Sequence, residues 1–182
     1  THGGSGDRRQ LRSVAAFVYL ANAASFLVVP ALASLSTRMR WEWSLPLVAV
    51  SAGLMGATLP LVSHFGIAPD DRAGARLSYV YVANIVGSSS GSLLTGFVFL
   101  EHLSLARVSV LLYVLGVLLC LGLVLPSYRG TSGRAAVVGL AIASVAVGVL
   151  GSGRLFDRVY EKLFFRKHFS GTERFDELIE NR

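Results

Sequence analysis

Five long apolar stretches account for most of this 182-residue chain, and each is long enough to cross a lipid bilayer as a helix. The hydrocarbon core of a bilayer is roughly 30 Å thick, so a spanning helix that rises about 1.5 Å per residue needs about 20 mostly apolar residues. The stretches cover approximately Leu11–Leu35, Trp43–Phe65, Leu77–Leu100, Ser104–Pro126 and Ala135–Gly151. The sequence therefore predicts an all-α fold, a polytopic bundle of about five transmembrane helices.

The composition agrees with a membrane protein. Hydrophobic residues make up 53% of the chain and charged residues only 15%, whereas a soluble domain usually carries about 25% charged residues. The net charge of +6 comes from Lys and Arg between the apolar stretches and in the tail. Basic residues that flank apolar spans reflect membrane topology and anionic headgroups more often than DNA contact. We therefore expect the lipid bilayer as a partner and no nucleic acid.

The chain divides into three parts. Residues 1–10 are expected to form a flexible N-terminal segment, residues 11–153 the helix bundle, and residues 154–182 an amphipathic helix with a charged tail. The apolar residues of this last part recur at helical spacing, which predicts a helix lying on the membrane surface or against the bundle; they are Leu155, Phe156, Val159, Tyr160, Leu163 and Phe164. Its aromatic and basic residues favour either binding to anionic lipid or docking of a following domain.

Small residues recur at helical spacing in the second and third stretches. Helices in lipid associate through close packing and interhelical hydrogen bonds rather than through hydrophobic force, so small residues favour contact between helices. The predicted helix-packing residues are Gly53, Gly56, Asn84, Gly87, Ser88, Gly91, Ser92 and Gly96. Most belong to the third stretch, which is expected to occupy the centre of the bundle. The fourth stretch, rich in Leu and Val, is expected to face lipid on most sides.

Two features of the third stretch have an alternative interpretation. Asn84 can bond to a neighbouring helix or contact a ligand in a cavity, and the bond is favoured because an unsatisfied amide is costly in lipid. The run Gly87–Gly91 resembles a phosphate-binding loop only in part, because no Gly-Lys-Ser/Thr follows it and it lies in an apolar span. Helix packing is the favoured interpretation for this run also.

The sequence predicts no catalytic, cofactor-binding or metal-binding residues. Spans without ionisable groups in their interior argue against a proton or ion pathway within this chain. The single cysteine, Cys120, lies in a leucine run and is expected to act as a small hydrophobic residue. The histidines lack the i, i+3 or i, i+4 partners of a metal site; they are His2, His64, His102 and His168.

Several runs of this sequence resemble the membrane region of spermidine synthase-like proteins. They are Gly56–Leu61 (G-A-T-L-P-L), Leu77–Gly87, Gly91–Phe97, and the tail runs Phe164–Phe169, Glu173–Phe175 and Glu180–Arg182. The resemblance covers about residues 50–125 and the tail. It implies a multi-helix membrane domain joined to a cytosolic aminopropyltransferase-type domain that acts in polyamine biosynthesis. The glycine-rich nucleoside site and acidic polyamine pocket of that domain are missing here, so no catalytic residue is carried over.

The expected function is that of an integral membrane anchor or scaffold module that holds a soluble domain or partner at the membrane. On this interpretation the chain is the membrane portion of a longer protein or a separate subunit. The alternative is a transport module or a structural subunit of a larger membrane complex. A polar cavity around Asn84, Ser88, Ser92 and Thr95 would favour transport, whereas a dry, tightly packed third helix would favour anchoring.

The expected location is the cell membrane, with several crossings. Five crossings place the N-terminus and the loops after the second and fourth stretches on one side, and the tail on the other. The side of the tail carries more basic residues; they are Arg38, Arg40, Arg107, Arg154, Arg158, Lys162, Arg166, Lys167, Arg174 and Arg182. Because positive residues favour the cytoplasmic side, the sequence predicts a cytoplasmic tail.

Overall fold

The computed structural model describes residues 3–39, 41–67, 69–128 and 130–172, and within this part of the chain every regular element is helical. The elements are α1 (Gly3–Arg38), η1 (Trp41–Trp43), α2 (Ser44–Gly66), α3 (Ala73–Leu94), η2 (Thr95–Phe99), α4 (Leu100–His102), α5 (Leu105–Val124), η3 (Leu125–Ser127), α6 (Thr131–Leu155), α7 (Val159–Phe165) and η4 (Arg166–His168). The segment η2 is one wide π-helical turn that joins α3 to α4 in a continuous run.

Five of these helical runs are long and apolar enough to cross a membrane, which confirms the prediction of an all-α fold with about five such helices. The runs extend over Arg9–Arg38, Ser44–Gly66, Ala73–His102, Leu105–Ser127 and Thr131–Leu155. The first helix begins at Gly3, so the described residues of the predicted flexible segment are helical. Their flexibility stays a prediction.

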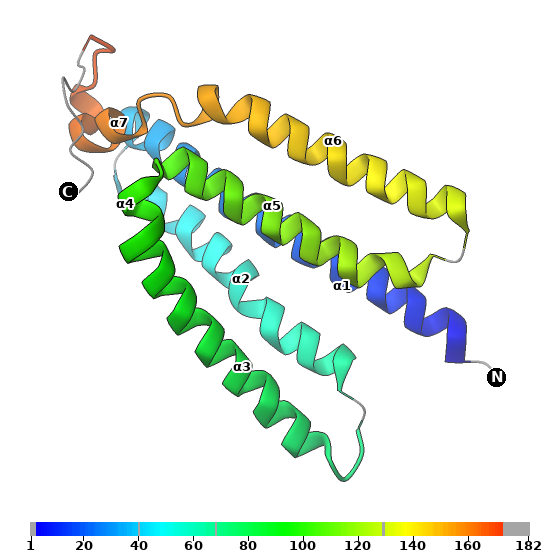
Figure 1. Cartoon of the computed structure of the whole chain (residues 1–182). Helices are drawn as coiled ribbons and strands as arrows, with labels where there is room; N and C mark the ends of the chain where they lie inside the picture. Colours follow the sequence, from blue (N-terminus) through cyan, green and yellow to red (C-terminus); the bar gives the residue numbers. More distant parts are fainter. Residues whose placement is uncertain (1–2, 40, 68, 129, 173–182) are drawn as a thin grey trace.

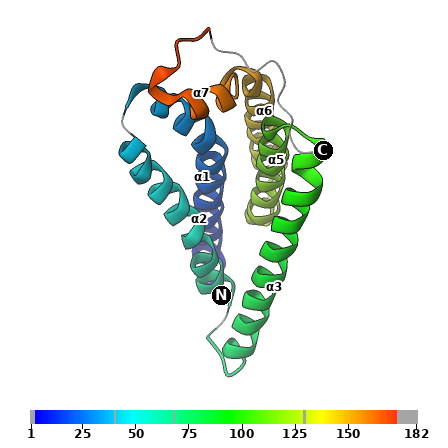
Figure 2. The same cartoon turned by 90° about the vertical axis from the view of Figure 1, so that its left-hand side faces the viewer.

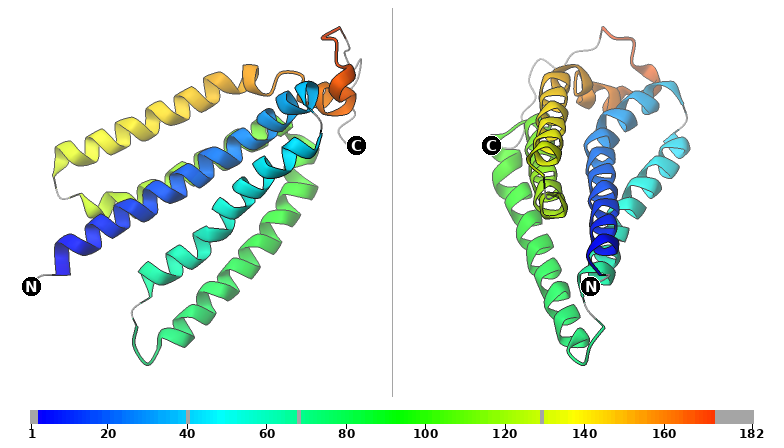
Figure 3. Two further views of the ribbon diagram at one scale, coloured as in Figure 1. Left: turned by 180° about the vertical axis from the view of Figure 1, so that it is seen from behind. Right: turned by 90° about the vertical axis from the view of Figure 1, so that its right-hand side faces the viewer.

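The two ends of the bundle carry the groups of loops expected from five crossings. The start of α1, the turn between α2 and α3 and the connection between α5 and α6 lie at one end, and α4 and α7 lie at the other (Figure 1). The views from behind and from the right show the same separation (Figure 3). Which end faces the cytoplasm stays a prediction.

Helices α1 and α5 form the centre of the bundle. Helix α1 packs against α2, α5 and α7, and α5 packs against both α1 and α6. The core cluster comprises Phe26 of α1 with Tyr113 and Val117 of α5. Phe26 stacks on Tyr113 with ring centroids 4.9 Å apart and meets Phe156, just after α6, at 5.6 Å. Aromatic pairs at these separations add to the stability of a core beyond the area they bury.

The prediction that the third stretch occupies the centre of the bundle is wrong for this chain on its own. No residue of α3 is buried, and its main packing is with η2, the turn that continues it. Helix α3 lies at the outer edge of the molecule in two views (Figures 1 and 3). The fourth stretch takes the central place instead, because α5 buries Val108, Tyr113, Val117 and Cys120. The expectation that it faces lipid on most sides stays a prediction, since only 22% of the apolar window of this run is buried.

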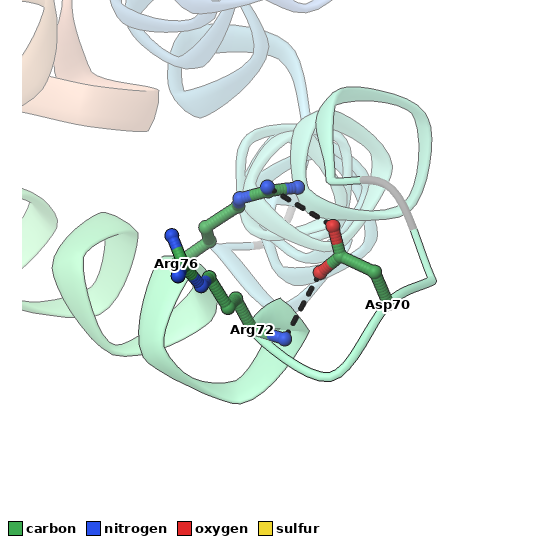
Figure 4. Close-up of polar contacts among 3 residues, drawn as sticks. All are labelled: Asp70, Arg72 and Arg76. Atoms are coloured by element: carbon green, nitrogen blue, oxygen red, sulfur yellow. Dashed lines mark hydrogen bonds and ion pairs between the residues drawn. The ribbon is translucent and has the colours of Figure 1, made fainter.

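The turn between α2 and α3 is built around Asp70. Its Oδ1 accepts the backbone N–H of Arg72 at 3.0 Å, and its Oδ2 pairs with Nη2 of Arg76 at 3.0 Å (Figure 4). The backbone oxygen of Asp70 accepts the N–H of Ala73, the first residue of α3, at 2.9 Å. The Asp70 side chain thus closes a turn just before α3, and its negative charge is favourable near the positive end of the helix dipole.

Beyond α6 the chain turns back onto the bundle. Arg158 has a left-handed backbone conformation (φ 52°, ψ 34°) that separates α6 from α7. Helix α7 packs against α1 and lies across the end of the bundle (Figure 2). The predicted amphipathic helix is therefore present but short, ending at Phe165. The predicted charged tail from residue 173 onward lies outside the described residues.

Candidate functional site

A cluster of three hydroxyl groups joins the three helices α1, α5 and α6. The Oγ of Ser144 lies 2.5 Å from the phenolic oxygen of Tyr113 and 2.8 Å from that of Tyr19, and the two phenolic oxygens are 3.4 Å apart. Each helix supplies one hydroxyl, and each hydroxyl has a partner in the cluster. The cluster therefore links three helices through polar groups that would otherwise be unsatisfied in an apolar setting.

A second polar contact lies one helical turn further along α1. The side-chain amide of Asn22 donates from Nδ2 to the backbone oxygen of Tyr113 at 3.0 Å. This close approach requires glycine at position 116, because a Cβ there would lie 2.2 Å from Oδ1 of Asn22. Glycine at position 148 of α6 serves the same purpose for the ring of Tyr113, whose Cε1 would lie 3.0 Å from an added Cβ. Small residues therefore do lie where the helices contact each other, but these residues are Gly116 and Gly148 rather than the predicted glycines.

Two adjoining hollows run along the same three helices. One has a volume of about 390 Å³ and the other about 400 Å³, and both are lined by Tyr19 and Leu140. The first continues toward the N-terminal end of α1 as far as Arg12 and Tyr128, and the second reaches Gly148 and other residues near the opposite end. Volumes of this size are typical of sites that hold small molecules or lipid chains. We call the two hollows together the α1/α6 groove.

Arg12 and Arg134 gather around the loop at the end of this groove. Nη2 of Arg12 donates to the backbone oxygen of Ser127 at 3.2 Å, and its guanidinium carbon lies 4.2 Å from the centre of the Tyr128 ring. Nε of Arg134 donates to the backbone oxygen of Tyr128 at 2.9 Å. Both arginines are exposed. Positive charge therefore concentrates beside the C-terminal end of α5, where the helix dipole favours it.

The predicted helix-packing residues lie apart from this site. An added Cβ at any of the glycines Gly53, Gly56, Gly87, Gly91 and Gly96 would meet no atom within 4 Å.

Their polar companions Asn84, Ser88 and Ser92 are exposed, and within the described residues Asn84 has no hydrogen-bond partner. Ser88 bonds only to the oxygen of Ile85 in its own helix, at 3.1 Å. The role of these residues in helix packing stays a prediction.

Within the described residues no group of three or more His, Cys, Asp or Glu side chains is placed to hold a metal ion. Cys120, the single cysteine of the chain, is free and buried in α5. The hydroxyls of the cluster have no basic side chain among their bonded partners to activate them.

Comparisons with protein-family models, with curated proteins and with solved structures gave no match for this chain. The fold therefore defines only a class, an all-helical chain with five helices long and apolar enough to span a membrane.

Sequence reasoning missed the hydroxyl cluster and the two glycines that contact it. A signal was available in α5, since Tyr113 and Gly116 interrupt an otherwise aliphatic run and lie near each other along the helix. Asn22 is one of the few amides within the five stretches, and it lies on the same stretch as Tyr19. Polar residues at membrane depth need partners, so these residues could have been paired as candidates.

Proposed function

We propose that this chain is an integral membrane module that holds a soluble domain or partner at the end of the bundle where α7 lies. The outward-facing side chains support the membrane location. Large apolar residues are exposed along all five long helices, including Leu150 at 83% and Leu140 at 72%. Soluble proteins rarely expose contiguous apolar surface on this scale, whereas a lipid environment would cover it.

The docking of α7 is the observation that carries the anchoring role. Val159 is only 2% exposed, and the backbone oxygen of Lys162 accepts a hydrogen bond from Oγ of Ser36 at 3.2 Å. The chain therefore leaves the bundle from a position held against α1. A soluble domain or partner attached to α7 would therefore be held at a fixed position relative to the membrane.

The outer face of α7 suits an interface between lipid and water. Phe164 is 72% exposed, and Arg166 and Lys167 follow it on the exposed surface. Aromatic rings beside basic residues are typical of helices that lie at the level of the headgroups. The resemblance to spermidine synthase-like proteins suggests an aminopropyltransferase-type domain as the part that is held.

Extraction of native membranes tests the location. Alkaline carbonate should leave the chain in the pellet, and only detergent should release it. A chain that stays monodisperse in buffer without detergent would contradict the membrane proposal.

A pair of variants tests the docking of α7. Val159→Asp should release α7, because a carboxylate would replace a buried apolar side chain. Trypsin cleavage after Arg158 and Lys162 should then rise at least roughly tenfold, as expected from a loss of about 1.4 kcal/mol in docking. Leu163→Asp is the matched control, since Leu163 is 38% exposed on the same helix. Equal cleavage in the two variants would count against docking.

A second candidate is a structural subunit or transport module of a larger membrane complex. The exposed face of α3 favours it, because this face carries small residues and Asn84, which has no hydrogen-bond partner among the described residues. The α1/α6 groove is not lined by the polar residues of α3. Native mass spectrometry in detergent separates the candidates, because a subunit of a membrane complex would carry further membrane chains, whereas an anchor would carry at most a soluble partner.

A further inference from the structure

The α1/α6 groove combines two kinds of surface in one place. Its walls are mostly apolar, with Ala15, Ala16 and Leu20 on α1 facing Val137 and Leu140 on α6. Helix α5 packs against both neighbours and supplies Val117 and Val124 between them. At one end the groove reaches the guanidinium of Arg12 and the ring of Tyr128. An apolar groove that ends at a cation suits a ligand with an apolar chain and an anionic headgroup.

The cations at this end retain hydrogen-bonding capacity. A guanidinium group has five N–H donors, and Arg12 and Arg134 each use one in the bonds to the Ser127 and Tyr128 carbonyls. The described partners of both groups are neutral. Their positive charges are therefore not cancelled by these contacts, and a planar guanidinium is well suited to a phosphate.

We propose that the α1/α6 groove binds one anionic phospholipid, with its phosphate at Arg12 and Arg134 and one acyl chain along α1 and α6. The inference rests on the proposed membrane location. Basic pockets between membrane helices are a recurrent means of recognising anionic headgroups. The second hollow lies along the same three helices and shares Tyr19 and Leu140 with the first.

A purely structural role for the arginines accounts for part of this arrangement only. Cations near the end of α5 stabilise its last carbonyls, and this explains the two backbone bonds. It does not account for an apolar groove that begins beside the same cations. A hollow of about 470 Å³ between α5 and α6 reaches a single arginine, Arg107, near the opposite end of the bundle, whereas two arginines lie at the end of the α1/α6 groove. It offers an internal control.

Lipid exchange measures the proposed binding directly. The full chain is placed in mixed bilayers containing phosphatidylglycerol and phosphatidylcholine in equal amounts, then released into detergent for native mass spectrometry. One phosphatidylglycerol should remain bound in preference to phosphatidylcholine. Arg12→Gln should lower that preference about fivefold, since a basic residue near the headgroup contributes about 1 kcal/mol. Arg107→Gln should leave it unchanged.

A second pair of variants tests the groove without altering its charge. Ala16→Phe places a ring among the groove-lining residues and should reduce phosphatidylglycerol retention, although both arginines remain. Leu119→Phe is the matched control, because Leu119 is 68% exposed on α5 and does not line the groove. Circular dichroism and the unfolding midpoint in detergent show whether each variant keeps the fold. Loss of retention in a folded Ala16→Phe chain would support the chain-binding part of the proposal.

The results that overturn the proposal are distinct. Equal retention of the two lipids by a membrane-integrated chain would refute the lipid site and leave the anchoring proposal intact. If inorganic phosphate at the same concentration as the lipid releases it, the arginines bind any phosphate group. That result would refute a contribution of the acyl chain to binding. A chain that needs no detergent would refute both proposals together.

Discussion

Helices α3 and α5 are of similar length, 22 and 20 residues, yet they occupy opposite positions in the molecule. Helix α5 buries four residues and contacts both α1 and α6, whereas α3 buries none. Their sequences suggest the reverse, because α3 has a row of glycine and serine and α5 is mostly Leu and Val. The difference shows that a small residue only makes the close approach of two helices possible. Whether the helices approach depends on the side chains of the neighbouring helix.

The largest expected difference in stability between variants of α5 and α3 comes from replacing one glycine in each helix by leucine. Gly116→Leu in α5 should destabilise the chain by about 3 kcal/mol, because its side chain would occupy the position of the Asn22 amide. Gly91→Leu in α3 should change the stability of the isolated chain by less than about 0.5 kcal/mol, because no atom lies within 4 Å of an added Cβ. Unfolding of detergent-solubilised protein by dodecyl sulfate measures both.

The Gly91 variant also reports on contacts outside the chain. If α3 packs against another subunit, Gly91→Leu should shift native mass toward smaller species without changing the unfolding of the single chain. Equal destabilisation by the Gly91 and Gly116 variants would show that the comparison between α3 and α5 is mistaken.

The two asparagines allow a finer comparison. Asn22→Ala should cost about 1 kcal/mol, because the bond to the Tyr113 carbonyl is lost and interhelical hydrogen bonds in membranes are worth roughly that much. Asn84→Ala should leave the unfolding of the isolated chain unchanged, since Asn84 is exposed and has no partner within the described residues. A larger loss for Asn84→Ala than for Asn22→Ala would reverse the assignment of the two amides.

The length and polarity of the helices could be predicted because they are properties of each stretch on its own. About 20 apolar residues define a long apolar helix wherever they occur. The neighbours of a helix depend instead on how side chains of different stretches match, and this is not visible within one stretch. Asn22 and Asn84 illustrate the limit, since the amide of Asn22 has a partner where it faces Gly116, and the exposed amide of Asn84 has none among the described residues. The apolar spacing predicts the helix that follows α6, but it does not predict that this helix ends as early as Phe165.

The hydroxyl cluster provides a smaller test within the packed region. Tyr113→Phe and Ser144→Ala should each cost roughly 0.6 kcal/mol, and the double variant should cost less than their sum, because both remove the same 2.5 Å contact. Ser88→Ala in α3 is the control, because the Ser88 hydroxyl bonds only within its own helix. Strictly additive losses would show that the two hydroxyls do not depend on each other.

The weakest expected effect lies at the start of α3. Asp70→Ala removes the bond from the backbone N–H of Arg72 and the pairing with the side chain of Arg76, both made by an exposed carboxylate, and should cost about 0.5 kcal/mol. Asp70→Asn keeps an acceptor for the N–H but loses the charge, so the difference between the two variants isolates the contribution of the helix-start bond. Asp71→Ala is the matched control. Hydrogen exchange should show faster opening of the first turn of α3 in Asp70→Ala and unchanged exchange in α5, because α3 is tied to the bundle mainly through its ends. Faster exchange in α5 as well would mean that the two helices open together, and α3 would then belong to the packed region after all.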